Sequence, residues 1–392
     1  MQQNKSLKKA FLIAGIILLG ACMRSPFTAL PSVITEIADS FHVPVTSLGM
    51  LTTIPLLCFG ILSSFVPLIC RRVGNNVAIL GALIVLIIGA YTRVISYSAL
   101  LIGTLLIGIA ITFINVLLPA IITEQLPNQV GLMTSLYGVA LDMFSAIFAY
   151  VITPLTLLFN WQIAVMILST LVIVTLLVWL PNVHHPVQPV NKQIKLAKHQ
   201  SVWHNWRAWC LLFYMAGSSM SFYITVTWLP TIARNHGMSS NAASIIAGFL
   251  QLFSMPAAFV IPLWASKMAK RNSLIWGSSI LTAIGFLGLM LPTNNFAYYT
   301  IMTLCLGLGT AASYSLIMTL FGLKTKNPNT TRDLSGMVQS VGYIIAALGP
   351  VSTGWLKSVT NTWDWSLLVS FLVVVICTIF GLLAEKQPYI EN

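Results

Sequence analysis

A single charge interrupts an apolar segment at residues 10–34, which reads AFLIAGIILLGACMRSPFTALPSVI. A helix that crosses a bilayer needs about 20 apolar residues, so this segment is long enough to span one. Arg24 lies inside it. A charge near the bilayer centre costs about 3 kcal/mol or more, so such a residue normally faces a partner, a cavity or a transport pathway. The segment therefore predicts a membrane helix with a polar site at depth.

The rest of the 392-residue chain repeats this apolar pattern. Hydrophobic residues make up 57% of the sequence and charged residues only 7%, whereas about 25% of residues are charged in soluble domains. This deficit indicates a surface that mostly faces lipid. Because lipid leaves backbone polar groups unsatisfied, long apolar runs must be helices rather than strands. The sequence predicts an all-α integral membrane protein with twelve spans, near 10–34, 46–69, 77–96, 99–123, 131–156, 162–181, 208–232, 241–265, 273–291, 297–322, 334–356 and 365–384.

The net charge of +12 follows the predicted topology. With the N-terminus in the cytoplasm, the lysines and arginines other than Arg24 gather in the inner segments. The outer loops and outer helix ends keep only Arg93, Arg234 and Lys357. An excess of Lys and Arg on inner loops is the usual orientation signal of membrane proteins. We therefore expect a multi-pass protein of the cytoplasmic membrane, with both termini in the cytoplasm and no nucleic-acid partner.

The longest polar stretch, Pro181–Arg207, lies at the middle of the chain. It holds prolines, lysines and four histidines, but no segment long enough to pack a core. The histidines do not predict a metal site, because a flexible linker does not preorganise the ligand geometry. The predicted domains are an N-terminal six-helix bundle at 1–181, a cytoplasmic linker at 182–207 and a C-terminal six-helix bundle at 208–392.

Two short patterns recur between the halves. The sequence FVPL at 65–68 has an echo in VIPL at 260–263, and GLMTS at 131–135 has one in GMVQS at 336–340. Both echoes join corresponding spans of the two halves, which indicates an internal duplication of the kind found in transporters.

The cysteines give no sign of a disulfide framework or a metal site. All six lie in or beside apolar runs, without a CxxC pair, and we interpret them as small packing residues. Cys22 ends a run that resembles a lipoprotein signal, but the apolar pattern continues to Ile34, which favours a residue inside a helix. The sequence also lacks a GxxxxGK[ST] segment, so ATP-driven transport is disfavoured and no cofactor is expected.

Small and polar residues recur at helical spacing along several spans, a pattern typical of a face turned away from lipid. For the Gly, Ser and Thr positions we favour packing between helices, because these residues let helices approach closely. Longer polar and aromatic side chains favour a central cavity. Besides Arg24, the predicted substrate-binding residues are Thr28, Asn115, Tyr223, Trp228, Gln251, Gln339 and Tyr343.

The span at 131–156 carries one acid, Asp142, at about the same depth as Arg24, roughly 20 Å from the inner side at 1.5 Å per residue. The two could neutralise each other, and a purely structural ion pair is the alternative. An anionic solute could displace Asp142 from the guanidinium, whose planar fork suits small oxyanions. Displacement would desolvate the carboxylate and favour its protonation, so Asp142 is the candidate for proton coupling as a hypothesis.

Several stretches together resemble the major facilitator superfamily, and within it the cyanate/nitroimidazole permease family. Cys22-Met23-Arg24 with Thr28 resembles the first-helix Arg segment of that family. Gly89-Ala90-Tyr91-Thr92-Arg93 resembles the end of its third helix, which makes Arg93 a further substrate-binding candidate. Further matching stretches are 115–119, 130–137, Trp228-Leu229-Pro230, Gln251 with Pro256, and 334–343.

The resemblance implies two pseudo-symmetric bundles, alternating access around a central site, and small anionic or polar nitrogen-containing substrates. The chain departs from the family at two places near the site. Ser25 stands where a proline usually follows the arginine, with Pro26 shifted by one, and Asp142 matches no family acid.

The superfamily loop motif between the second and third spans is degraded in this chain. Asn75 and Asn76 stand where basic residues are expected, and the acidic residue of the motif is absent, which puts its usual gating interaction in doubt. The gating-loop candidates that remain are Arg71, Arg72 and Gly74, with Lys267 in the second half.

We therefore expect a secondary active transporter, monomeric, that moves a small anionic or polar nitrogen-containing solute through the bilayer. Efflux of a toxicant or drug is one alternative, because aromatic residues near the expected cavity would suit a flat heterocycle. A membrane-embedded transferase is less favoured, because the eight acids are scattered and only Glu36 and Asp39 lie close together. No soluble signalling domain is present to suggest a sensor.

Overall fold

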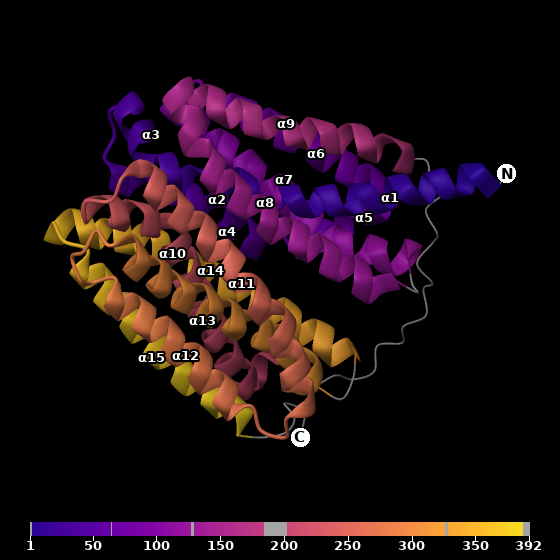
Figure 1. Cartoon of the computed structure of the whole chain (residues 1–392). Helices are drawn as coiled ribbons and strands as arrows, with labels where there is room; N and C mark the ends of the chain where they lie inside the picture. Colours follow the sequence, from indigo (N-terminus) through magenta and orange to yellow (C-terminus); the bar gives the residue numbers. More distant parts are fainter. Residues whose placement is uncertain (1, 64, 127–128, 184–201, 326–327, 387–392) are drawn as a thin grey trace. The chain divides into compact units, whose positions relative to one another are not determined.

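The computed structural model describes residues 2–63, 65–126, 129–183, 202–325 and 328–386, and within these ranges the regular structure is entirely helical (Figure 1). Most of the predicted linker at 182–207 lies outside the described residues. Backbone contacts divide the chain into two compact units. We call Met1–Val43 with Ile61–Asn191 the first unit, and Pro44–Gly60 with Lys192–Asn392 the second unit.

The first unit begins with a long helix, continues with several short helical pieces, and ends with four further long helices and a short 3₁₀ turn. Its elements are α1 (Gln2–Cys22), α2 (Ser25–Thr28), η1 (Leu30–Val33), α3 (Ile34–Phe41), α5 (Val66–Val73), α6 (Asn75–Thr92), α7 (Tyr97–Gln125), α8 (Val130–Leu158), α9 (Trp161–Trp179) and η4 (Leu180–Asn182).

The second unit takes most of α4 from the first half of the sequence and six long helices from the second half. Its elements are η2 (Val45–Gly49), α4 (Met50–Leu62), η5 (Val202–His204), α10 (Trp206–Asn235), α11 (Ser240–Lys267), α12 (Asn272–Gly288), α13 (Phe296–Leu323), α14 (Pro328–Thr360) and α15 (Asp364–Glu385).

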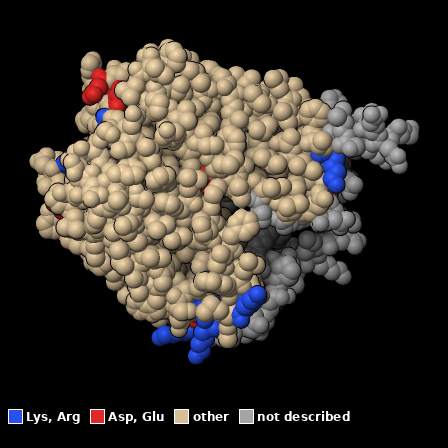
Figure 2. Space-filling view, viewed as in Figure 1, with Lys and Arg blue, Asp and Glu red and all other residues tan. Residues whose placement is uncertain are grey.

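The helices have the length and composition of membrane spans. Among the described residues, eleven are long and apolar enough to cross a bilayer, and α12 is a shorter apolar helix of 17 residues. Large apolar side chains such as Leu158, Leu263 and Trp355 are exposed on them, as expected of surfaces that face lipid. Figure 2 shows a broad uncharged face on which Lys and Arg gather only in places. The predicted all-helical membrane fold is confirmed.

Two predicted spans differ from continuous helices, and proline explains both differences. The second predicted span, 46–69, is divided between α4 and α5, with Pro67 in the first turn of α5, where its missing N–H costs no hydrogen bond. The first predicted span, 10–34, is broken into α1, α2 and η1, and Pro26 and Pro31 open the latter two elements.

The helix α10 forms the core of the second unit, with most of its residues buried against α14, α15, α13 and α11. The start of α4 docks here as well. Thr53 donates a hydrogen bond to the carbonyl of Ala347 at 2.8 Å, and Thr227 donates to Thr52 at 2.8 Å. These bonds explain why a segment of the first sequence half belongs to the second unit.

Candidate functional site

The break in the first span places Arg24 in irregular backbone. Pro26 has no N–H to donate to the carbonyl four residues earlier, so the α-helical ladder stops. The hydroxyl of Ser25 donates to the carbonyl of Ala21 at 2.6 Å, which satisfies part of the exposed end of α1. Arg24 precedes α2 with φ −128° and ψ −36°. Discontinuous helices of this kind build the solute sites of many transporters.

Arg24 meets Asp142 across the first unit. Its Nη1 atom donates to Oδ1 of Asp142, which lies in α8, at 3.1 Å. The side chains keep 23% and 15% of their surface exposed. The predicted pairing of the two residues is therefore present, in a place that is neither sealed nor fully hydrated. A charged pair with this much exposure is open to competition by another anion.

Thr28 and Asn115 are placed differently relative to this pair. Thr28 is 3% exposed, and its hydroxyl donates to the carbonyl of Arg24 at 3.1 Å, so it stabilises the backbone break from one turn away. Asn115 is half-buried on α7. Their predicted roles in substrate binding stay predictions.

Arg93 ends α6 and reaches back to the same broken segment. Its Nη1 atom donates to the carbonyl of Pro26 at 2.5 Å, and the residue is only 4% exposed. Gly89 and Gly103 bring α6 and α7 into close backbone contact beside it, since a Cβ atom at either glycine would clash with the other helix. The segment at residues 24–26 is therefore fixed at two points. Arg24 binds Asp142 of α8, and the carbonyl of Pro26 accepts from Arg93.

In the second unit, Tyr343 and Gln339 lie on α14 in a partly polar setting. The hydroxyl of Tyr343 is 3.0 Å from that of Tyr314 on α13, and its ring centroid is 5.7 Å from that of Phe59. Gln339 is half-buried and donates to the hydroxyl of Ser335 at 3.0 Å. Tyr314 was not among the predicted residues, although its pairing with Tyr343 makes it part of the same cluster.

Trp228 is placed as a packing residue. It is fully buried, its indole N–H donates to the carbonyl of Pro350 at 2.9 Å, and its ring is 5.1 Å from that of Trp363. Gly49 and Gly354 lie so close to the ring that a Cβ atom at either would clash with it. These contacts favour a structural role, and substrate binding by Trp228 stays a prediction.

The other two predicted residues of the second unit are buried as well. Tyr223 is 5% exposed, with its ring 5.2 Å from that of Phe222. Gln251 is 2% exposed, and its Oε1 atom has no hydrogen-bond partner among the described residues. A buried acceptor of this kind normally meets water or a ligand. Gln251 thus remains a candidate for contact with a polar solute.

The predicted gating loop is only partly described. The side chains of Arg71 and Arg72 lie outside the described residues. Gly74 has φ 84°, a conformation that side chains rarely adopt, and so it allows the sharp turn between α5 and α6. Lys267 is exposed at the end of α11. The gating roles of these residues stay predictions.

Asn76, which departs from the superfamily motif, is the centre of an amide network. Its Nδ2 donates to the carbonyl of Asn182 at 2.7 Å, and its Oδ1 accepts from Gln125 at 3.0 Å. The indole of Trp179 donates to its backbone carbonyl at 3.0 Å. We call Asn76, Gln125, Trp179 and Asn182 the amide corner, where the start of α6 meets the ends of α7 and α9.

A corresponding corner of the second unit holds ions instead. Glu385 at the end of α15 lies 2.8 Å from Lys324 Nζ and 3.2 Å from Arg271 Nη1. Burial lowers the pKa of the Lys324 ammonium below its ordinary value of 10.5, although the bond to Glu385 acts in the opposite direction. We call Arg271, Lys324 and Glu385 the ion corner, where the start of α12 meets the ends of α13 and α15. No pattern in the sequence indicated that these three residues lie together.

Comparison with known proteins identifies the family. A family model of the Major Facilitator Superfamily matches residues 12–346. An uncharacterized transporter of Bacillus subtilis is 33% identical over 390 residues, which cover 99% of this chain and 96% of the relative. A 2-nitroimidazole transporter of Escherichia coli is 30% identical, covering 97% of this chain and 96% of its own length.

More distant matches extend the same pattern. A cyanate transport protein of Escherichia coli is 23% identical, with 90% of this chain and 91% of the relative covered. Among solved structures, that of the nucleoside transporter NupG superposes with a TM-score of 0.79 at 12% identity, covering 96% of this chain and all of its own. At that identity the likeness shows the fold alone.

Proposed function

The chain belongs to the Major Facilitator Superfamily and is a membrane transporter rather than an enzyme, and on that premise we propose that Arg24 recognises its solute. The solute is a small anionic or polar nitrogen-containing molecule, moved by secondary active transport through alternating access. The observation that carries this proposal is the Arg24–Asp142 pair, 3.1 Å apart and partly exposed within membrane-spanning helices.

Recognition proceeds by exchange of anions on the guanidinium. Asp142 neutralises Arg24 at a distance of 3.1 Å. A planar or linear solute with a negative or strongly dipolar end takes the place of the carboxylate, because the guanidinium fork offers parallel N–H donors. The carboxylate then loses its partner in a poorly hydrated place and takes up a proton. Uptake of solute and proton at one site gives a route to proton coupling.

The relatives support the nitrogen-containing class of solute. One relative is a 2-nitroimidazole transporter and another is a cyanate transport protein. 2-Nitroimidazole and cyanate are both small molecules with a polar, electron-rich end that a guanidinium can bind. Gln251, whose buried Oε1 atom has no hydrogen-bond partner among the described residues, is proposed to supply a further polar contact.

Efflux of an uncharged heterocycle is the second candidate, and one observation favours it. Tyr343, Tyr314 and Phe59 form an aromatic cluster in the second unit, with a pair of phenol hydroxyls 3.0 Å apart. Aromatic faces suit a flat ring, and a phenol hydroxyl can donate to a nitro group or ring nitrogen. In this version Arg24 and Asp142 form a structural pair.

The predicted location, topology, domain organisation and oligomeric state are also part of the proposal. We place the protein in the cytoplasmic membrane with both termini in the cytoplasm, on the charge distribution. We also propose two six-helix bundles at 1–181 and 208–392, joined by the linker at 182–207, and a monomeric transporter.

A thermal-shift screen of detergent-purified protein tests the solute class. Cyanate, nitrate, small carboxylates and nitroimidazoles are compared on the wild type, Arg24→Gln and Tyr314→Phe. A ligand that binds the folded state raises its stability by about 2.7 kcal/mol at a hundred times its Kd. An anion that stabilises the wild type but not Arg24→Gln supports the proposal. Stabilisation by an uncharged heterocycle alone, equal in Arg24→Gln but weaker in Tyr314→Phe, would favour efflux instead.

A further inference from the structure

The charges inside the predicted spans do not balance. Arg24, Arg93 and Asp142 are the charged residues within those spans, two cations against one acid. Asp142 is engaged by Arg24 at 3.1 Å. Arg93 is 4% exposed, and among the described residues it has no ionic partner. One buried positive charge of the first unit is therefore left over.

The groups that contact Arg93 compensate only part of this charge. Its Nη1 donates to the carbonyl of Pro26, but its Nε has no hydrogen-bond partner among the described residues. The residue also follows the last turn of α6, where the helix dipole is negative. A carbonyl and a helix end carry partial charges, whereas a buried cation without a full counter-charge is strongly unfavourable.

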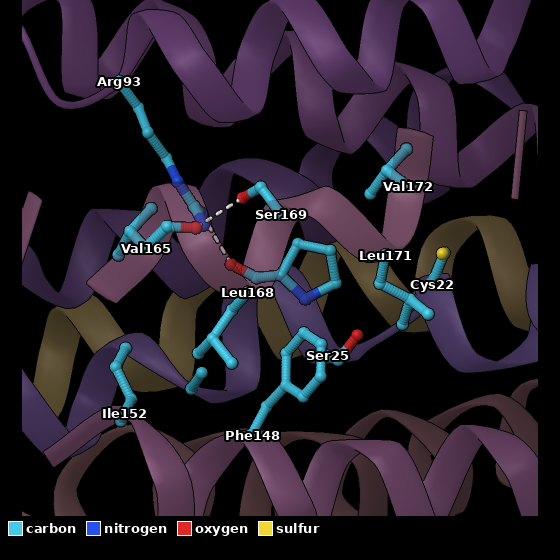
Figure 3. A pocket seen from close by; sticks show the side chains of 12 residues that line it. Cys22, Ser25, Arg93, Phe148, Ile152, Val165, Leu168, Ser169, Leu171 and Val172 are labelled. Atoms are coloured by element: carbon cyan, nitrogen blue, oxygen red, sulfur yellow. Dashed lines mark hydrogen bonds between the residues drawn. The ribbon is translucent and has the colours of Figure 1, made fainter. Parts of the chain in front are cut away.

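A pocket opens directly beside the guanidinium (Figure 3). It is bounded by the broken first span, α8 and α9, and it is small, with room for about one water-sized occupant. The hydroxyls that line it are already used as donors. Ser25 donates to Ala21 at 2.6 Å, and Ser169 donates to Val165 at 2.7 Å. Arg93 is thus the lining residue that offers unused N–H donors to an occupant.

The pocket is separate from the Arg24 site. Cys22, Ser25 and Ala29 of the broken segment line it. Arg24 and Thr28, which belong to the same segment, are not among its lining residues. The remaining walls are mainly apolar, including Phe148, Ile152 and Val172. An occupant there meets Arg93 without displacing Asp142.

We propose that this pocket binds a small monovalent inorganic anion of the size of chloride, ion-paired with Arg93. The anion supplies the counter-charge that the first unit lacks, in apolar surroundings that strengthen the attraction. It is a resident ligand, distinct from the transported solute. By fixing Arg93 against Pro26 it also holds the broken segment that carries Arg24.

Halide-dependent stability of the detergent-purified full chain tests the proposal. Sodium gluconate is replaced stepwise by chloride or bromide at constant ionic strength while Tm is recorded. We expect a saturable rise in Tm for the wild type with either halide. Arg93→Gln should lose this rise. Arg24→Gln is the matched control outside the pocket and should keep it, even if it loses the response to transported solutes.

Two further measurements cover the case in which Arg93→Gln does not fold. Ser169→Leu retains the guanidinium but fills the pocket, and should weaken the halide response at least tenfold in concentration. Chloride-35 NMR on the wild type should show line broadening that bromide reverses. The proposal is overturned if the wild type shows no halide response, if Arg93→Gln or Ser169→Leu keeps it unchanged, or if Arg24→Gln alone abolishes it.

Discussion

The amide corner of the first unit and the ion corner of the second each fix the start of one helix to the ends of two others. The two corners do this with different side-chain chemistry. Neutral side chains do this around Asn76, with bonds of 2.7–3.0 Å. Charged side chains do it around Glu385, at 2.8–3.2 Å. The degraded loop motif is therefore replaced locally by amides.

The interiors of the helices show the opposite distribution of charge. The predicted spans of the first half carry Arg24, Arg93 and Asp142, whereas those of the second half carry no charge. The first unit thus uses neutral groups at the amide corner and keeps Arg24 and Asp142 at depth, where charges are costly and normally functional. Arg93 lies at the predicted outer end of α6. The second unit keeps its ions at helix ends. This difference supports the proposal that a charged solute is recognised in the first unit.

The largest effect is expected from Glu385→Gln, which breaks the ion corner. Arg271 and Lys324 would be left close together without their shared acid, at a cost of about 3–5 kcal/mol for a broken buried pair. Denaturant or thermal unfolding in detergent measures this loss. Glu124→Gln is the matched control, because Glu124 is exposed and, among the described residues, accepts from Asn75 at 3.2 Å. Equal losses in both variants would contradict a structural ion corner.

Asn76→Ala should break the amide corner at a smaller cost. It removes two side-chain hydrogen bonds and leaves the carbonyl of Asn182 and the amide of Gln125 without these hydrogen-bond partners, which costs about 2 kcal/mol. The same unfolding assay checks this value, with Asn75→Ala as the neighbouring control. If Asn76→Ala were as stable as the wild type, the network would be incidental to the fold.

Tyr314→Phe tests whether the second unit contributes to recognition of a heterocyclic solute. It removes a single hydroxyl contact of 3.0 Å in the second unit and leaves the ion pair of the first unit intact. Affinity for a heterocyclic solute should fall about fivefold, in line with one neutral hydrogen bond, while affinity for a small anion stays unchanged. Competition binding with both solutes measures the ratio. A parallel loss for both would show that the units do not divide recognition.

The smallest effect concerns His236 at the end of α10. Burial lowers the pKa of this imidazole below 6.5. The unfolded chain therefore takes up its proton at a higher pH than the folded chain, so stability falls as the pH drops below about 6.5. Tm of the wild type should decline more steeply than that of His236→Asn over this range. Identical pH profiles would exclude a contribution from His236.

Much of the fold follows from the sequence, because lipid imposes a simple pattern. Apolar runs of about 20 residues can only be helices in a bilayer, so the number and position of the spans could be predicted. The break near Arg24 was harder to locate, since its extent depends on how Ser25 and Pro26 share the carbonyls of the preceding turn. Only the shifted proline signalled it.

Contacts at the site could be predicted where a charged side chain inside a membrane span needed a partner. Charges inside membrane spans need partners, and Arg24 and Asp142 lie at about the same predicted depth. Each was therefore the expected partner of the other. Tyr314 and the ion corner gave no such signal. Glu385 and Lys324 lie at the ends of apolar runs, where charges are ordinary, and only three-dimensional packing reveals that they are buried together.

The affinity of Asp142→Asn for the solute tests the central claim most directly. If solute and Asp142 compete for Arg24, removal of the carboxylate charge should tighten solute binding about tenfold at neutral pH, the value of one charge-assisted hydrogen bond. The pH dependence of binding should disappear with it. Calorimetric titration of the wild type and the variant gives both results. Unchanged or weaker binding in Asp142→Asn, with the pH dependence retained, would contradict the exchange of anions on Arg24.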